Sequence, residues 1–151
     1  MVDKITTGDE TQSQPELIRF VTDELGVIVN SEQNSVDFIN ITPSGITMSG
    51  QSVQITQDAD ADASSIDVSV DESILAVVVS KGACLRGELY LINTSTLQKY
   101  GPYELGFNPD AVDIAVDNKF VVVVNEFDYE DGVDGGCQTL GFPGVSVYDI
   151  S

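Results

Sequence analysis

Three stretches of the chain repeat one pattern of apolar and polar positions. Each copy has an apolar segment, a short acidic turn, a second segment rich in valine and, beyond a loop, a third apolar segment. The copies lie at Ile18–Ile41, Ile66–Thr94 and Val112–Ser151. Self-similarity at a period of about 45 to 50 residues is typical of repeat architectures. The pattern therefore predicts a fold built from successive copies of one unit.

The residues of these segments favour β-strands. Val, Ile, Phe and Tyr dominate them, and such side chains suit a pleated sheet. Ala76–Val79 and Phe120–Val124 are apolar at every position, which is typical of strands covered on both faces. The third segments alternate instead, as Val145–Ile150 does, and fourth strands are expected at Ile46–Ile55 and Leu97–Leu105. Each second strand is expected to end near a small polar residue, which is Asn30, Ser80 or Asn125.

These strands predict an all-β fold of consecutive four-stranded antiparallel blades of a β-propeller, incomplete in this chain. A blade of four strands covers its neighbours on both sides, which explains the doubly apolar segments. We expect a polar N-terminal segment over residues 1–15 and blades at about 16–57, 64–106 and 109–151. A closed ring takes about 4–8 blades, so we expect a fragment of a longer chain or a unit completed by another subunit. An ordinary two-layer sandwich is the alternative.

Charge narrows the set of partners. The chain has 25 acidic and 6 basic residues, a formal net charge of -19, and no histidine. The acidic surface repels phosphates, so neither a nucleic acid nor an anionic membrane surface is expected as a partner. The lack of histidine excludes Ser-His, Cys-His and His-zinc chemistry within this chain. Salt screens such a surface, which fits an extracellular, marine or halophilic setting.

Two further expectations concern location. No run of about 18 apolar residues is present, so no segment is expected to span a membrane. Residues 1–16 are polar and show no signal peptide. The protein is therefore expected to be cytosolic, or the sequence to be a mature form or a fragment.

The third copy, NPDAVDIAVDNKFVVVVNEFDYEDGVDGG…PGVSVYDIS, resembles the extracellular propellers of the YVTN and choice-of-anchor I type. Their repeats have the pattern P-D-x-V-x-x-S-P-D-G, a valine-rich strand ending in A-N-E, an acidic insert and G-x-V-x-V-x-D. The usual Ser-Pro before the turn is replaced here by Ala115-Val116. The resemblance implies a secreted or surface propeller, often of seven blades, whose activity is mostly unassigned. The matching residues are Pro109, Asp110, Val112, Asp117, Asn125, Glu126, Gly144, Val145, Val147 and Asp149.

Two acidic loops are the candidate metal sites. Clustered carboxylates repel one another unless a cation lies between them, and hard oxygen ligands in irregular loops suit Ca²⁺. The first loop starts like a calcium loop but has Ala63 and Ser69 where an EF-hand needs Gly and Glu. A solvated loop without metal is the alternative for both. The candidate Ca²⁺ ligands are Asp58, Asp60 and Asp62 in the first loop, and Glu126, Asp128, Glu130, Asp131 and Asp134 in the second.

Cysteines and sequons add two more candidates. Cys84 and Cys137 lie in equivalent inserts of adjacent blades, so we predict a disulfide between them; two buried free thiols are the alternative. Asn40 and Asn93 begin Asn-x-Ser/Thr sequons and are possible glycosylation sites in a secretory setting.

The sequence favours a non-catalytic structural or binding propeller module, extracellular or at the cell surface. We expect it to be stabilised by Ca²⁺ and to associate with a protein partner or with itself through exposed edge strands, or with the remaining blades of a longer chain. The alternative is part of a calcium-dependent propeller hydrolase of the lactonase, phosphatase or phytase type. An intracellular scaffold with free thiols is a third possibility. No catalytic residue is assigned, because nothing selects a pair from 25 carboxylates.

Overall fold

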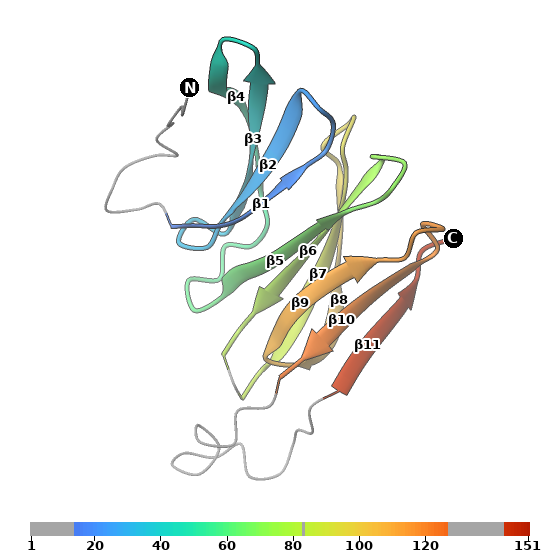
Figure 1. Ribbon diagram of the computed structural model, residues 1–151. Coiled ribbons are helices and arrows are strands. Elements are labelled where there is room, and N and C mark those ends of the chain that lie inside the picture. The colour runs from blue at the N-terminus through green and yellow to red at the C-terminus, as the bar shows by residue number, and fades with distance from the viewer. Residues whose placement is uncertain (1–13, 83, 127–143) are drawn as a thin grey trace.

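The computed structural model describes residues 14–82, 84–126 and 144–151. Within these ranges the chain forms eleven strands arranged in three antiparallel sheets. Four strands form the first sheet in the order of the sequence (Figure 1). They are β1 (Pro15–Phe20), β2 (Leu25–Asn30), β3 (Ser35–Thr42) and β4 (Gly45–Gln54).

The second and third sheets follow in succession along the chain. The second sheet consists, in order, of β5 (Asp62–Val68), β6 (Ile74–Ser80), β7 (Arg86–Asn93) and β8 (Lys99–Phe107). The third has the order β11-β10-β9, from β9 (Pro109–Ile114), β10 (Phe120–Asn125) and β11 (Gly144–Asp149). Each sheet is made of consecutive strands, which confirms the all-β fold of consecutive antiparallel blades. The two-layer sandwich is therefore wrong. No helix in the described ranges has the length and apolar character needed to cross a membrane.

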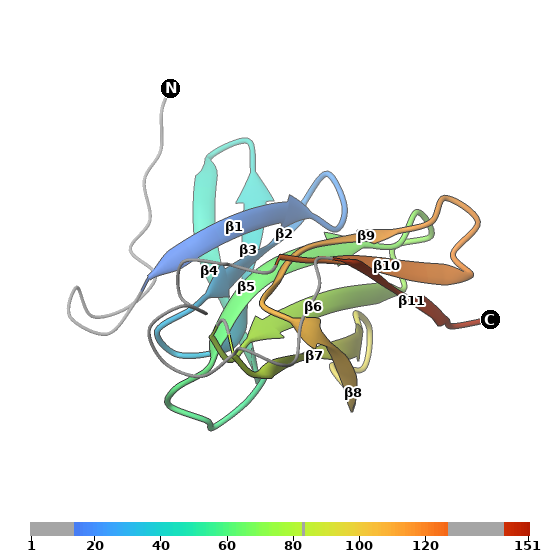
Figure 2. The same ribbon diagram turned by 90° about the horizontal axis from the view of Figure 1, so that it is seen from below.

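The first strand of each sheet lies beside the first strand of the next. β5 contacts β1 on one side and β9 on the other, and Figures 1 and 2 show the sheets following one another around these strands. The other strands of each sheet extend outward from this line. This radial arrangement stacks the faces of neighbouring sheets against each other.

Two apolar cores fill the spaces between the sheets, and β6 contributes to both. Val77 and Val79 belong to the core between the first and second sheets, whereas Ala76 and Val78 belong to the core between the second and third. All four side chains are fully buried, which confirms that this segment is covered on both faces. Burying a valine side chain contributes about 1.5–3 kcal/mol, so β6 helps to hold the three sheets together.

The third sheet differs from the second. Val121 and Val123 are buried in the second core, but Phe120 and Val124 on the opposite face of β10 are exposed. The expected cover on both faces of Phe120–Val124 is therefore found on one face only. The reason is physical: an apolar segment is covered on both faces only where a sheet packs on each side.

The second strands end at the predicted small polar residues, β2 at Asn30, β6 at Ser80 and β10 at Asn125, and β-bulges lie close to these ends. Asn30 pairs with Pro15, and Asn125 pairs with Pro109, each beside a bulge. In the second sheet the pairing beside the bulge is between Val79 and Ala63. In the register of the sheets the position equivalent to Asn30 and Asn125 is therefore Val79, one residue before the end of β6. A bulge adds one residue to one strand and so shifts the faces of everything beyond it.

Candidate functional site

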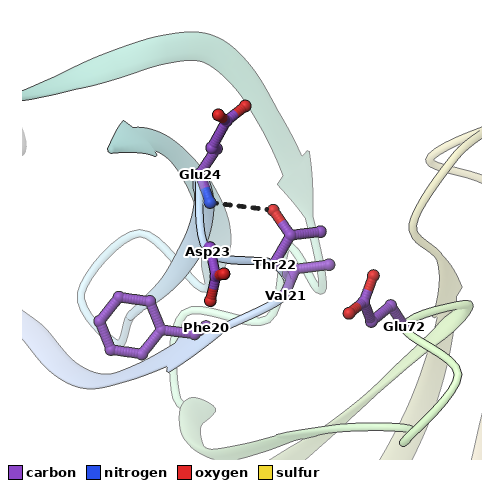
Figure 3. A pocket seen from close by; sticks show the side chains of 6 residues that line it. All are labelled: Phe20, Val21, Thr22, Asp23, Glu24 and Glu72. Carbon is purple, nitrogen blue, oxygen red and sulfur yellow. Dashed lines mark hydrogen bonds between the residues drawn. The ribbon is translucent and has the colours of Figure 1, made fainter. Parts of the chain in front are cut away.

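The turns of the first two sheets form an open pocket of about 560 Å³ (Figure 3). Its lining comprises Phe20, Val21, Thr22, Asp23 and Glu24 around the β1–β2 turn, together with Glu72 from the β5–β6 turn. Three of the six side chains are carboxylates. Within the described ranges no ion pair involves any of the three. The pocket is therefore an acidic depression that attracts cations.

Side-chain hydrogen bonds fix the shape of these turns. Thr22 Oγ1 accepts the backbone N–H groups of Glu24 at 3.1 Å and Leu25 at 3.0 Å. In the next turn the Asp71 carboxylate accepts hydrogen bonds from the Ser69 and Ser73 hydroxyls, at 2.7 and 2.8 Å. These hydrogen bonds, that from Ser69 first, lower the pKa of Asp71 below its usual value. Asp71 thus stays ionised and serves to hold the turn.

The turn of the third sheet is joined to that of the second. Asn118 has a left-handed backbone with φ of 57°, and its Oδ1 accepts the backbone N–H of Val70 at 2.9 Å. Asparagine tolerates this conformation better than most residues. The three turns consequently form one face of the molecule, held by contacts between sheets.

The predicted loop of Asp58, Asp60 and Asp62 lies between β4 and β5. Asp58 Oδ1 accepts the backbone N–H of Asp60 at 3.2 Å, and its Oδ2 lies 3.8 Å from Lys81 Nζ. Asp62 is the first residue of β5 and pairs with Ser80. No three acidic or cysteine side chains in the described part of the chain lie close enough together to hold a metal ion. The three aspartates therefore do not converge on one point.

The second predicted loop lies mostly outside the described residues. Glu126 is exposed, and its backbone N–H donates to Asn108 O at 2.9 Å. The other four candidates, Asp128, Glu130, Asp131 and Asp134, lie outside the described ranges. The calcium site predicted there stays a prediction.

The cysteine and glycosylation candidates have these positions. Cys84 is not a free thiol, and Cys137 lies outside the described residues, so their pairing stays a prediction. Asn40 is exposed within β3, where it pairs with Leu25. Asn93 ends β7, and its Oδ1 accepts the backbone N–H of Thr96 at 2.8 Å.

A polar network that sequence reasoning missed joins the first and second sheets. Glu88 Oε1 lies 2.6 Å from Lys81 Nζ, and Glu88 Oε2 accepts the Tyr90 hydroxyl at 2.8 Å. Burial, followed by Glu88, raises the pKa of Tyr90 to about 12. Lys99 Nζ lies 5.1 Å from the Tyr90 ring centre and donates to Gln54 O at 2.9 Å. Lysine is scarce in this sequence, and that scarcity is the one sequence signal that could have pointed to Lys81 and Lys99.

The innermost strands are joined by side chains that accept backbone N–H groups. Asp67 Oδ2 on β5 accepts the N–H of Ile114 on β9 at 2.8 Å, and Ser65 Oγ accepts that of Val112 at 3.3 Å. Asp67 Oδ1 also lies 3.7 Å from Arg19 Nε on β1. Asp67 therefore contacts both neighbouring sheets. It also supplies a hydrogen-bond acceptor for a backbone N–H group of β9, which is an edge strand of the third sheet.

A family model for the choice-of-anchor I domain matches residues 17–151. The chain belongs to the choice-of-anchor I domain family. The match spans all three sheets, and it confirms the resemblance predicted from the third copy of the repeat. No curated protein matches the sequence of this choice-of-anchor I domain.

Three solved structures share the fold of the choice-of-anchor I domain. The hydrazine synthase of Kuenenia stuttgartiensis has a TM-score of 0.70 and 14% identity, over 91% of this chain and 39% of that one. The periplasmic gluconolactonase of Pseudomonas aeruginosa has a TM-score of 0.57 and 13% identity, over 93% and 43%. The Dos1 propeller has a TM-score of 0.52 and 13% identity, over 77% and 31%. The domain thus spans less than half the length of each, and identities this low show the fold alone.

Two motif residues of the choice-of-anchor I domain pack one blade against the next. A Cβ atom added at Gly87 would lie 2.2 Å from Pro109 Cγ, and one added at Gly106 would lie 2.6 Å from Asn125 Cγ. Both glycines belong to the second sheet, whereas Pro109 and Asn125 belong to the third. The Pro and Asn of the motif therefore hold adjacent blades in close contact, which is a structural role.

Proposed function

We propose that this choice-of-anchor I domain is a non-catalytic binding module of an extracellular or cell-surface protein, and that its acidic loops bind a cationic partner. One observation carries the proposal: the few cations in the described part of the chain are engaged internally. Each Lys and Arg in the described ranges contacts a carboxylate or a backbone carbonyl. In the described ranges the carboxylates of the turns and loops outnumber these cations, and the excess is left for an external counter-charge.

The rigid support of these carboxylates favours recognition. Loops carried by a packed β scaffold hold their side chains at low entropic cost, which suits binding. The pocket at Thr22–Glu24 and Glu72 joins turns from two blades. A basic protein surface and Ca²⁺ are both cations of suitable chemistry, and the family supports a location outside the cell.

The proposal also names a specific cation, Ca²⁺. We propose that Ca²⁺ stabilises the loops of Asp58–Asp62 and Glu126–Asp134, and that the exposed edge strands support self-association. The test is thermal unfolding of the intact protein in CaCl2 against NaCl of equal ionic strength. Calcium should raise the Tm beyond the sodium control, and the gain should shrink in an Asp58→Asn, Asp60→Asn variant. Equal Tm values in the two salts would remove calcium from the proposal.

Location and catalysis are tested separately. A protease that does not enter cells should digest the protein on intact cells while a cytoplasmic marker survives. Purified protein with Ca²⁺ should not turn over lactones, phosphomonoesters or phytate. Turnover that is lost on chelation would instead favour the calcium-dependent hydrolase.

A further inference from the structure

A cleft between the first and second sheets is lined without any acidic residue. Its volume is about 450 Å³, which lies in the range of small-molecule sites, about 300–1,000 Å³. One wall is the end of β4 with the segment that follows it, and the other wall is formed by β7 and β8. None of the eight lining residues is Asp or Glu, although the chain has 25 of them. This cleft therefore differs in charge from the acidic pocket described above.

Lys99 supplies the positive charge of this cleft. The other four cations of the described ranges each form an ion pair with a carboxylate. Within the same ranges Lys99 forms none, and its Nζ donates instead to Gln54 O at 2.9 Å and to Ile55 O. An ammonium group has three N–H donors, so one is left for the cleft. Carbonyl oxygens position the ammonium, but they do not neutralise its charge.

The ammonium is held in place by both walls. Gln54 Nε2 donates to Gln33 O at 2.6 Å and to Thr56 O at 2.7 Å, which fixes the segment that carries the two carbonyl acceptors. On the opposite wall, Lys99 Nζ lies 5.1 Å from the centre of the Tyr90 ring. Tyr90 is only 5% exposed, so its ring cannot move away. A charge positioned in advance costs little conformational entropy when a ligand binds.

The other lining residues indicate what accompanies a negative charge in the ligand. Gln57 is exposed, and in the described part of the chain its side-chain amide makes no hydrogen bond. An amide both donates and accepts, which suits hydroxyl groups. Pro102 and the Tyr90 ring offer apolar surface to a carbon skeleton. The net charge of -19 repels a polyanion or a doubly charged phosphate more strongly than a single carboxylate.

We propose that this cleft binds a small monocarboxylate that carries hydroxyl groups, a hydroxy acid or an acidic sugar, with its carboxylate on Lys99 Nζ and its hydroxyl groups at Gln57. The cleft lies between two sheets that each have four strands, so no further part of a propeller is needed to form it. It is separate from the acidic loops and from the cationic partner proposed above.

Lysine side-chain NMR of the intact protein tests the site, because the chain has only four lysines. Lactate, glycerate and glucuronate, added without calcium at constant ionic strength, should shift the Lys99 signal along a saturable curve. Lactamide, glycerol and glucose are the neutral analogues and should produce no saturable shift. Lys119, which is exposed and lies 3.6 Å from Asp117, is the internal reference. If no carboxylate shifts the Lys99 signal, or if the neutral analogues act equally, the proposal fails.

Two substitutions at Lys99 separate its charge from its structural contacts. Lys99→Gln should weaken carboxylate binding on the order of tenfold or more, the loss expected for a charge-assisted hydrogen bond. Lys99→Arg keeps the charge and should retain most of the affinity. Backbone amide signals of residues 54–57 report binding, and thermal unfolding reports the fold. Equal loss of binding in both variants would show a purely structural role and contradict the assignment.

A charge introduced at Gln57 gives an independent test that leaves Lys99 intact. Gln57→Glu places a carboxylate beside the ammonium at an exposed position, so it should abolish binding with little change in Tm. Gln51→Glu is the matched control, because Gln51 is exposed on β4 outside the cleft and its substitution adds the same charge. Equal binding by the two variants would count against the cleft as the site.

Inorganic phosphate tests the chemical class of the anion. It should bind more weakly than glucuronate at the same ionic strength, because the acidic surface repels its second charge. Tighter binding of phosphate, with a shift of the same Lys99 signal, would overturn the assignment to a monocarboxylate. All of these measurements are made without calcium and without a basic partner, so their outcome is independent of the function proposed above.

Discussion

At the scale of single residues, Glu88 holds two neighbouring side chains of the second sheet, Lys81 and Tyr90. One of its oxygens lies 2.6 Å from Lys81 Nζ and the other accepts the Tyr90 hydroxyl at 2.8 Å. The hydrogen bond with Glu88 raises the pKa of Lys81. Tyr90 is itself 5% exposed, and its pKa is raised to about 12, by burial first. Both proton-bearing groups are thus held in their protonated forms by the fold.

Stability should consequently fall in strongly alkaline solution. The folded protein holds the Tyr90 proton up to a pKa of about 12, whereas the phenol of an unfolded chain has a pKa near 10. This contribution is fully present below about pH 10 and is lost as the pH rises towards 12. Urea unfolding of the parent and of Tyr90→Phe, from about pH 8 to 12, should show a decline on the order of 2 kcal/mol steeper in the parent. Parallel profiles would contradict this assignment, and Tyr148, whose pKa is also raised, remains as an internal reference in both proteins.

At the scale of elements, the second and third sheets approach closely at a glycine. Gly106 on β8 faces Asn125 at the end of β10, and its backbone N–H donates to Ser146 Oγ at 3.3 Å. Asn125 Nδ2 donates to the same hydroxyl at 3.0 Å. Ser146 therefore joins the edge of the second blade to the third, and a side chain at residue 106 would separate them.

Gly106→Ala should destabilise the protein by about 1–3 kcal/mol, because the new Cβ would lie 2.6 Å from Asn125 Cγ. The matched background is Asn125→Ala, which removes the atoms that the Cβ would meet. In that background Gly106→Ala should cost much less, and denaturant unfolding of the four proteins measures the coupling. Additive free energies would show that the close approach is not the cause.

Strand positions could be predicted from the sequence because they depend on local chemistry. The runs of valine predict β6 and β10 from the local sequence alone. The bulge between Ala63 and Ser65 could not be predicted, because a bulge leaves no clear trace in composition. The Lys99 contacts were missed for another reason. They are made to backbone carbonyls of the first sheet, and a carbonyl acceptor has no residue type that a motif could show.

The candidate site was predicted less well than the fold. Acidic loops can be found by composition, but convergence of their carboxylates depends on where each side chain points. Asp58 is turned towards Asp60 N–H and Lys81 instead of towards a shared centre. The pocket at Glu72 joins turns that lie far apart in the sequence. Only the stacking of sheets brings such groups together.

At the scale of the whole molecule, unbalanced charge opposes the compact state. A net charge of -19 on 151 residues creates repulsion among surface carboxylates. Exposed ion pairs such as Lys119–Asp117, at 3.6 Å, contribute little against it. The less exposed pair of Lys81 and Glu88 is screened less by salt because water and ions reach it less. Salt should therefore weaken the repulsion more than it weakens the attractive contacts.

We expect the Tm to rise steadily as NaCl increases from low concentration to about 1 M, since the Debye length falls from about 10 Å at 0.1 M to about 3 Å at 1 M. Sodium and potassium chloride at equal ionic strength should act alike, because screening does not depend on which cation supplies it. Scanning calorimetry of the intact protein measures the effect. Sucrose at matched osmolality controls for exclusion of the solute from the protein surface. It should leave the dependence of the Tm on salt unchanged. A flat or falling Tm would mean that the acidic loops are already neutralised by a bound partner or ion.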